Sequence, residues 1–128
     1  MTGVNHALTG ALVASSINRP ILGLAGAFLS HFAIDSLPHW DYQVPGSTKN
    51  RRIAMVLDLS LSCLLLFVLG LGLDVNAWLF IAGGFLAILP DTMWLPYILQ
   101  RKSSPFNKQT PLHIIRRLHI KIQWSETT

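Results

Sequence analysis

The stretch IAMVLDLSLSCLLLFVLGLGL, residues 53–73, decides the fold class of this chain. Asp58 is its only charged residue, and as a helix rising about 1.5 Å per residue it is long enough to cross a hydrocarbon core of roughly 30 Å. The composition agrees, since 51% of the 128 residues are hydrophobic and only 12% are charged. A soluble domain carries about 25% charged residues, so we expect an integral membrane protein.

Three further apolar segments have recognisable ends. Residues 5–17 are rich in small side chains, residues 20–36 begin with Pro20, a favoured first helical residue, and residues 77–99 are interrupted by Pro90. The first two segments are short, and we expect their small residues to hold them in a tight hairpin. The sequence thus predicts one all-α domain over residues 1–128, a membrane-embedded four-helix bundle with helices at 5–17, 20–36, 53–73 and 77–99.

Basic residues predict the orientation of the bundle. If all four segments cross, nine of the ten Lys and Arg residues share one side with the N-terminus, and only Arg19 lies opposite. The positive-inside rule then predicts a multi-pass protein of a bacterial or archaeal inner membrane with both termini in the cytoplasm. Residues 105–128 form a basic amphipathic tail that we expect at the membrane surface. This asymmetry accounts for the net charge of +4, so we expect lipid and not nucleic acid as the partner.

Acidic and imidazole side chains gather at the cytoplasmic depth of this topology. A carboxylate inside a membrane helix costs about 2.5–3.5 kcal/mol, and none of the four segments contains a Lys or Arg to pair with it. A bound cation would meet this need. His31 and Asp35 are four residues apart, on one helix face. We predict the metal ligands His6, His31, Asp35, His39, Asp58 and Asp91, with Asp41 as a catalytic residue that handles protons.

The donor types indicate the metal. Imidazole nitrogen mixed with carboxylate oxygen suits zinc, our first choice, and also manganese or iron, whereas magnesium and calcium prefer oxygen alone. The number of donors is sufficient for one ion or for two bridged by a carboxylate. Two-metal sites are typical of phosphoester hydrolysis, in which both ions stabilise the transition state.

Several alternatives stay open from sequence alone. Asp58 is also suited to binding the N-terminus of another helix, and Asp91, which follows Pro90, to capping a restarted helix. His39 and Asp41 are equally interpretable as polar loop residues. The tail histidines, His113 and His119, either join the site or lie at the surface, and we expect the surface. Glycine pairs such as Gly83 and Gly84 leave a homo-oligomer possible.

Two short motifs carry a family resemblance. The segment HFAIDSLPHWD, residues 31–41, resembles the zinc-binding signature of bacterial zinc-dependent phospholipase C. The elements NHALTGA, SHxxxD (His31 and Asp35) and LPD (ending at Asp91) are similar to those of bacterial membrane-bound metal-dependent hydrolases of the LexA-regulated inner-membrane type, although that family's HRxxTHS element is absent here. The resemblance implies a metal-dependent hydrolase with these residues at its centre.

Together these features predict a metal-dependent membrane hydrolase that acts on a phosphoester of a lipid or lipid-linked substrate, of the phospholipase C or lipid phosphatase type. Two other functions remain as alternatives: an ion or proton transport protein, and a non-catalytic membrane protein stabilised by a metal. A conduit would spread polar groups over the full membrane depth, whereas these segments are apolar in their outer halves.

Overall fold

The structure, a computed structural model, describes residues 1–39, 48–92, 114–115, 119 and 122. The longer described ranges are all helical apart from short turns. The helices are α1 (Gly3–Ser16), α2 (Pro20–Asp35), α3 (Thr48–Gly72) and α4 (Ala77–Thr92). The all-α prediction is therefore confirmed for the described residues. The last part of the predicted fourth helix, and most of the predicted amphipathic tail, lie outside them.

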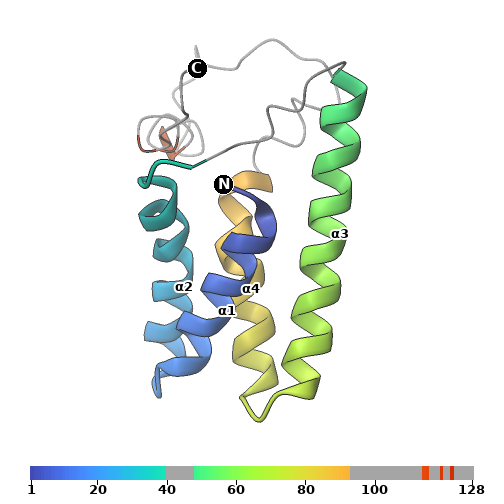
Figure 1. Ribbon diagram of the computed structural model, residues 1–128. Helices are drawn as coiled ribbons and strands as arrows, with labels where there is room; N and C mark the ends of the chain where they lie inside the picture. The colour runs from blue at the N-terminus through green and yellow to red at the C-terminus, as the bar shows by residue number, and fades with distance from the viewer. Residues whose placement is uncertain (40–47, 93–113, 116–118, 120–121, 123–128) are drawn as a thin grey trace.

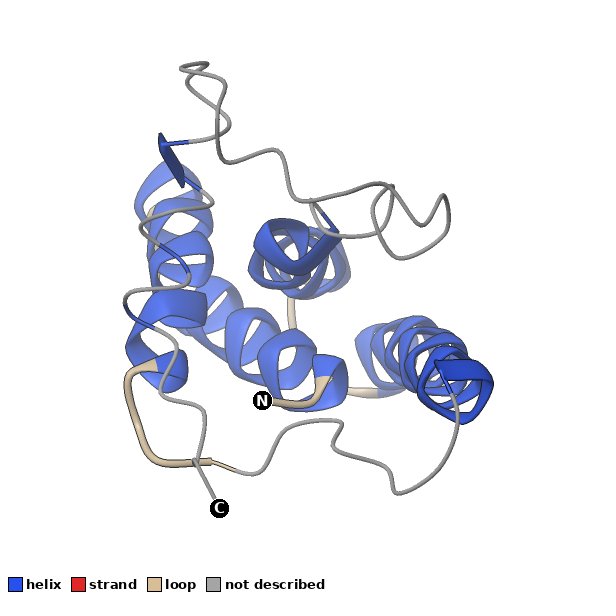
Figure 2. Ribbon diagram, turned by 90° about the horizontal axis from the view of Figure 1, so that it is seen from above, coloured by secondary structure: helices blue, strands red, loops and turns tan. Residues whose placement is uncertain are grey.

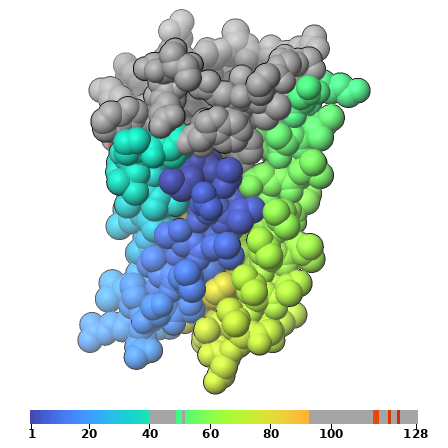
Figure 3. Space-filling view, in the orientation of Figure 1, coloured from blue at the N-terminus to red at the C-terminus, as the bar shows by residue number. Residues whose placement is uncertain are grey.

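The four helices run alternately up and down (Figure 1). Helices α1 and α4 form the central pair, with α2 packed on one side and α3 on the other, as the view along the bundle also shows (Figure 2). In the space-filling view, α1 covers most of α4 between the outer helices (Figure 3). The up-and-down order brings the beginnings of α1 and α3 to the same end of the bundle as the last turns of α2 and α4.

Small residues allow the central helices to approach closely. Ala7, Gly10, Ala11 and Ala14 form the buried stripe of α1, at helical spacing. A Cβ on Gly10 would lie 2.6 Å from the carbonyl oxygen of Gly83 on α4, so the two backbones are in direct contact there. Small-residue packing of this kind is the usual way in which membrane helices come together.

Large apolar side chains lie on the outside of the bundle instead. The buried hydrophobic cluster is small and consists of Ala7, Ala11, Leu66, Phe80 and Ile88. Exposed apolar side chains on the outer helices α2 and α3 include Ile21, Leu22, Leu29, Leu57, Leu61, Leu64, Val68 and Leu71, and on α4 they include Trp78, Phe85 and Leu89. Within the described residues one segment, Arg52–Gly72, is long and apolar enough to cross a membrane, while α2 and α4 are apolar but shorter.

The helix ends differ from the sequence prediction in one informative place. Helix α3 begins at Thr48, five residues before the predicted start at Ile53. The added turn, TKNRR, has no apolar side chain, so the apolar pattern used to predict the helix did not include it. Lys and Arg are nevertheless good helix formers. At the opposite end of the bundle, Asn76 caps α4 by accepting a hydrogen bond from the N–H of Leu79 at 3.1 Å.

Candidate metal centre

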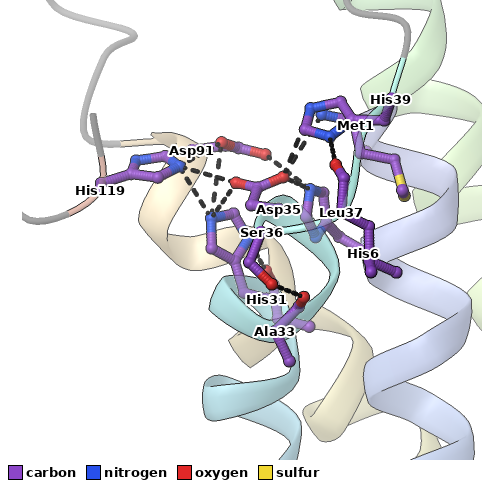
Figure 4. Close-up of polar contacts among 12 residues, drawn as sticks. Met1, His6, His31, Ala33, Asp35, Ser36, Leu37, His39, Asp91 and His119 are labelled. Atoms are coloured by element: carbon purple, nitrogen blue, oxygen red, sulfur yellow. Dashed lines mark hydrogen bonds and ion pairs between the residues drawn. The ribbon is translucent and has the colours of Figure 1, made fainter. Parts of the chain in front are cut away.

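Histidine and aspartate side chains meet at the end of the bundle where α2 and α4 finish and α1 begins (Figure 4). The order of the helices explains why these residues converge. Residues at the carboxyl ends of the two upward helices and in the first turns of α1 share one level. The residues are His6 from α1, His31 and Asp35 from α2, His39 just beyond α2, Asp91 from α4 and His119 from the C-terminal segment.

The fully buried carboxylate of Asp35 is the middle of this cluster. Its Oδ2 lies 3.0 Å from Nε2 of His119 and 3.2 Å from Nε2 of His31. Its Oδ1 lies 3.1 Å from Nε2 of His6 and 3.4 Å from the amino group of Met1. A buried charge is tolerated only when it is surrounded by partners of this kind. Asp35 therefore depends on groups from three other parts of the chain.

The ring of His31 is fixed by a backbone hydrogen bond. Its Nδ1–H donates to the carbonyl oxygen of Ala87 on α4 at 2.8 Å, which assigns the proton of the neutral ring to Nδ1. The lone pair of Nε2 then faces Nε2 of His119, only 3.0 Å away. A histidine that ligates a metal is commonly oriented in this way, with its other nitrogen held by a carbonyl. Two imidazole nitrogens beside one carboxylate oxygen need a shared proton or a cation.

Asp91 forms the more open side of the cluster. Its Oδ1 is 3.7 Å from Nε2 of His119 and 3.8 Å from Nε2 of His31. The side chain of Asp91 is 35% exposed, whereas those of His31 and Asp35 are fully buried. Asp91 lies in the last turn of α4, directly after Pro90, which has no N–H to continue the helix ladder. Solvent reaches the cluster at this residue.

The spacing of the donor atoms fits a metal ion. One ligand atom from each of His31, Asp35, Asp91 and His119 lies within 4.8 Å of the other three. Tetrahedral coordination at about 2.0–2.2 Å places neighbouring ligand atoms roughly 3.3–3.6 Å apart. The nitrogen–nitrogen and nitrogen–oxygen distances within this group run from 3.0 to 3.8 Å. These distances are close to the spacing that one cation requires, so this group can hold a metal ion.

His6 and His39 lie on the other side of Asp35. The ring of His6 stacks on that of His31 with centroids 4.1 Å apart, and its Nε2 is 3.9 Å from Oδ2 of Asp91. His39 donates from Nδ1–H to the carbonyl oxygen of Leu37 at 2.7 Å, and its Nε2 is 3.9 Å from Oδ1 of Asp35. The structure thus brings five of the predicted residues together: His6, His31, Asp35, His39 and Asp91.

The structure does not bring Asp58, the sixth predicted ligand, to this cluster. Its Oδ2 accepts a hydrogen bond from the N–H of Gly3 at 2.6 Å, and its Oδ1 accepts one from the N–H of Val4 at 3.2 Å. The carboxylate caps the first turn of α1, whose N–H groups have no partner within the helix. The ligand assignment is replaced by the alternative that was left open from sequence, binding of another helix N-terminus.

His119 is the residue that the sequence analysis placed incorrectly. We expected it at the surface, but it is buried in the cluster against His31 and Asp35, with the ring of Phe32 6.0 Å away. No periodicity or spacing connects a tail residue to a helix more than eighty positions earlier. The predicted catalytic Asp41 and the second tail histidine, His113, lie outside the described residues.

Comparisons of the chain with protein-family models, with curated proteins and with solved structures found no match.

Proposed function

We propose that the chain is a membrane-embedded, metal-dependent hydrolase that cleaves a phosphoester of a lipid or lipid-linked substrate. The main support for this proposal is that the four donor residues differ in burial and in distance from one another. His31, Asp35 and His119 are buried and lie 3.0–3.2 Å from one another, whereas Asp91 is farther away and partly exposed. Three tight protein donors with an open fourth side are characteristic of catalytic zinc sites, and four closed donors of structural ones.

The outer surface supports the membrane assignment. Exposed apolar side chains cover the outer helices, and soluble monomers seldom expose apolar patches of that extent. Lys49 and Arg52 begin α3 at the end that holds the cluster, and Arg19 and Asp74 lie in the two turns at the other end. By the positive-inside rule, the cluster then faces the cytoplasmic leaflet of an inner membrane.

The lengths of the helices support a site at the depth of lipid headgroups. The 25 residues of α3 extend about 37 Å, while α1, α2 and α4, of 14 to 16 residues, extend about 21–24 Å. The short helices end below the first turn of α3, and the cluster lies at their ends (Figure 1). The phosphoester of a bilayer lipid lies near this level, at the boundary of the hydrocarbon core.

The residues suit hydrolysis in the following way. A bound divalent cation would acidify water and neutralise the charge that develops on the phosphoryl oxygens. Asp91, on the open side, accepts a proton from the attacking water while the water oxygen forms a bond to phosphorus. The bond between phosphorus and the ester oxygen breaks, and the departing oxygen takes the proton from Asp91. His31 and His119, together with Asp35, would hold the cation opposite the phosphate. Basic residues at this end would help attract the anionic substrate.

The proposal is tested with the full chain in lipid nanodiscs. We expect bound zinc, manganese or iron by elemental analysis, and release of headgroup or phosphate from mixed phospholipids. Asp91→Asn should keep the metal bound by His31, Asp35 and His119 while slowing hydrolysis at least a hundredfold, because a general base contributes typically 10²–10⁴-fold. Asp74→Asn, in the turn between α3 and α4 at the far end, is the matched control and should be fully active.

Two results would contradict the hydrolase. Bound metal without hydrolysis of any lipid class would favour the non-catalytic, metal-stabilised protein. The protein can also be reconstituted into closed vesicles of the same lipids. Metal-dependent ion flux across these vesicles, without hydrolysis, would favour the transport protein.

A further inference from the structure

Both carboxylates of the cluster divide their oxygens between two sides. For Asp35, Oδ2 faces His31 and His119, while Oδ1 lies 3.1 Å from Nε2 of His6 and 3.9 Å from Nε2 of His39. For Asp91, Oδ1 faces His31 and His119, while Oδ2 lies 3.9 Å from Nε2 of His6. Each side therefore holds two imidazoles and one oxygen from each carboxylate.

Three of the four ring nitrogens on the second side form no hydrogen bond with the described residues. Among the residues that the structure describes, Nδ1 and Nε2 of His6 and Nε2 of His39 are buried without a hydrogen bond. The His6 side chain is fully buried and that of His39 is 3% exposed. Buried polar groups are nearly always satisfied, so such a concentration of unsatisfied ones at one place indicates a missing ligand.

His39 is also oriented as His31 is. In both residues Nδ1–H donates to a backbone carbonyl, of Leu37 for His39 and of Ala87 for His31, and Nε2 points to a different oxygen of the same Asp35 carboxylate. Fixing Nδ1 in this way leaves the Nε2 lone pair free to bind a cation. The donor sets on the two sides are thus matched in type and number, and His39 is oriented as His31 is.

We infer that the cluster is a two-ion centre, in which a second divalent cation is held by His6 and His39 and is bridged to the first by Asp35, with Asp91 on the open side of both ions. This inference rests on the metal centre of the proposed function. The nitrogen–oxygen distances on the second side, 3.1 to 3.9 Å, bracket the separation of roughly 3.3–3.6 Å expected between neighbouring tetrahedral ligands. Carboxylate bridges hold paired ions about 3.5–4 Å apart. Nitrogen and oxygen donors in equal number select zinc, manganese or iron over magnesium or calcium.

Metal stoichiometry gives the first test. The full chain is stripped with a chelator, titrated with Mn²⁺ in detergent, and analysed for bound metal after removal of excess. We expect two equivalents in the native sequence, one in His39→Ala and in His6→Ala, and none in Asp35→Asn, which removes the bridge. Asp74→Asn, far from the cluster, should keep both equivalents.

Electron paramagnetic resonance gives a readout that hydrolytic activity cannot give. Two Mn²⁺ ions joined by a carboxylate are magnetically coupled, and we expect a coupled spectrum for the native protein at two equivalents. The spectrum of His39→Ala should be that of isolated Mn²⁺. The native titration stands on its own if a variant does not fold.

The possible failures are distinguishable. One equivalent in the native protein that is lost in His119→Ala but unchanged in His39→Ala would overturn the second ion and leave the proposed hydrolase standing. In that case the amino group of Met1, 3.4 Å from Oδ1 of Asp35, is the cation that balances this side. Absence of metal in the native protein would overturn both.

Discussion

The carboxylate of Asp58 on α3 accepts a hydrogen bond from the backbone N–H of Gly3, at the start of α1, over a distance of 2.6 Å. The N-cap residue of α1, Thr2, gives no side-chain hydrogen bond to this turn in the described part of the chain. A residue 55 positions away thus supplies the cap, and its negative charge faces the positive end of the helix dipole. The contact also fixes the start of α1 one turn before His6.

Removal of this cap should destabilise the bundle. We expect Asp58→Ala to lower the free energy of unfolding by about 1–2 kcal/mol, as loss of a helix cap does, and Asp58→Asn to lower it less because the amide oxygen still accepts a hydrogen bond. Thermal unfolding followed by circular dichroism in detergent measures the difference. Ser60→Ala, at an exposed position of α3, is the control. Loss of metal from Asp58→Asn at unchanged stability would restore Asp58 as a ligand.

The contact between the backbones of α1 and α4 makes a second prediction. A Cβ on Gly83 would lie 2.7 Å from the carbonyl oxygen of Gly10, and backbone cannot rotate away. Gly83→Ala should therefore reduce the free energy of unfolding by about 1–3 kcal/mol, the usual cost of overpacking. Gly72→Ala is a matched control, because a Cβ there has open space. Equal melting temperatures for the two variants would show that the central helices are farther apart than described.

Phe32 should support the cluster without binding a metal. Its ring packs edge-on against those of His31, at 5.1 Å, and His119, at 6.0 Å. Groups that orient metal ligands typically change affinity by 10–100-fold, and we expect Phe32→Leu to weaken Mn²⁺ binding on the order of tenfold. Phe28, which packs on Phe32 one turn earlier, provides the control Phe28→Leu. A competition titration against a chelator measures both, and equal affinities would remove this role.

Thiol labelling in intact bacterial cells tests the orientation. In a Cys63→Ala background, a membrane-impermeant reagent should modify Asp74→Cys, in the turn between α3 and α4, and should leave Lys49→Cys unmodified until the cells are opened. Both positions are exposed, so accessibility in the protein itself does not limit the reaction. The reverse pattern would place the cluster on the outer side of the membrane.

Local patterns in the sequence were sufficient for the helices and for part of the cluster. Apolar runs bounded by proline and glycine predicted four helices, whose described ends agree to within a few residues except at Thr48, where the first turn is polar. The predicted end of the fourth helix lies outside the described residues. His31 and Asp35 were recognisable together, because their spacing places them on one helix face. His6 and Asp91 followed from topology alone, since the alternating order puts the start of the first segment and the later part of the fourth at the same end of the bundle.

The remaining contacts depend on tertiary structure. The same residue type lies beside the histidine cluster in Asp91 and caps a helix terminus in Asp58, and only the position of α1 decides between these contacts. His119 joins the cluster through a connection that no helical periodicity encodes. Its contact with Asp35 spans 84 residues, beyond any local rule of sequence interpretation.

The late position of His119 in the chain sets an order for biosynthesis. Since His119 follows the last of the four helices, it leaves the ribosome after all of them. The four-residue donor group can therefore be completed only after the helices have emerged. Under the proposed function, a chain truncated before His119 would form the helices without this donor and would be inactive towards lipids.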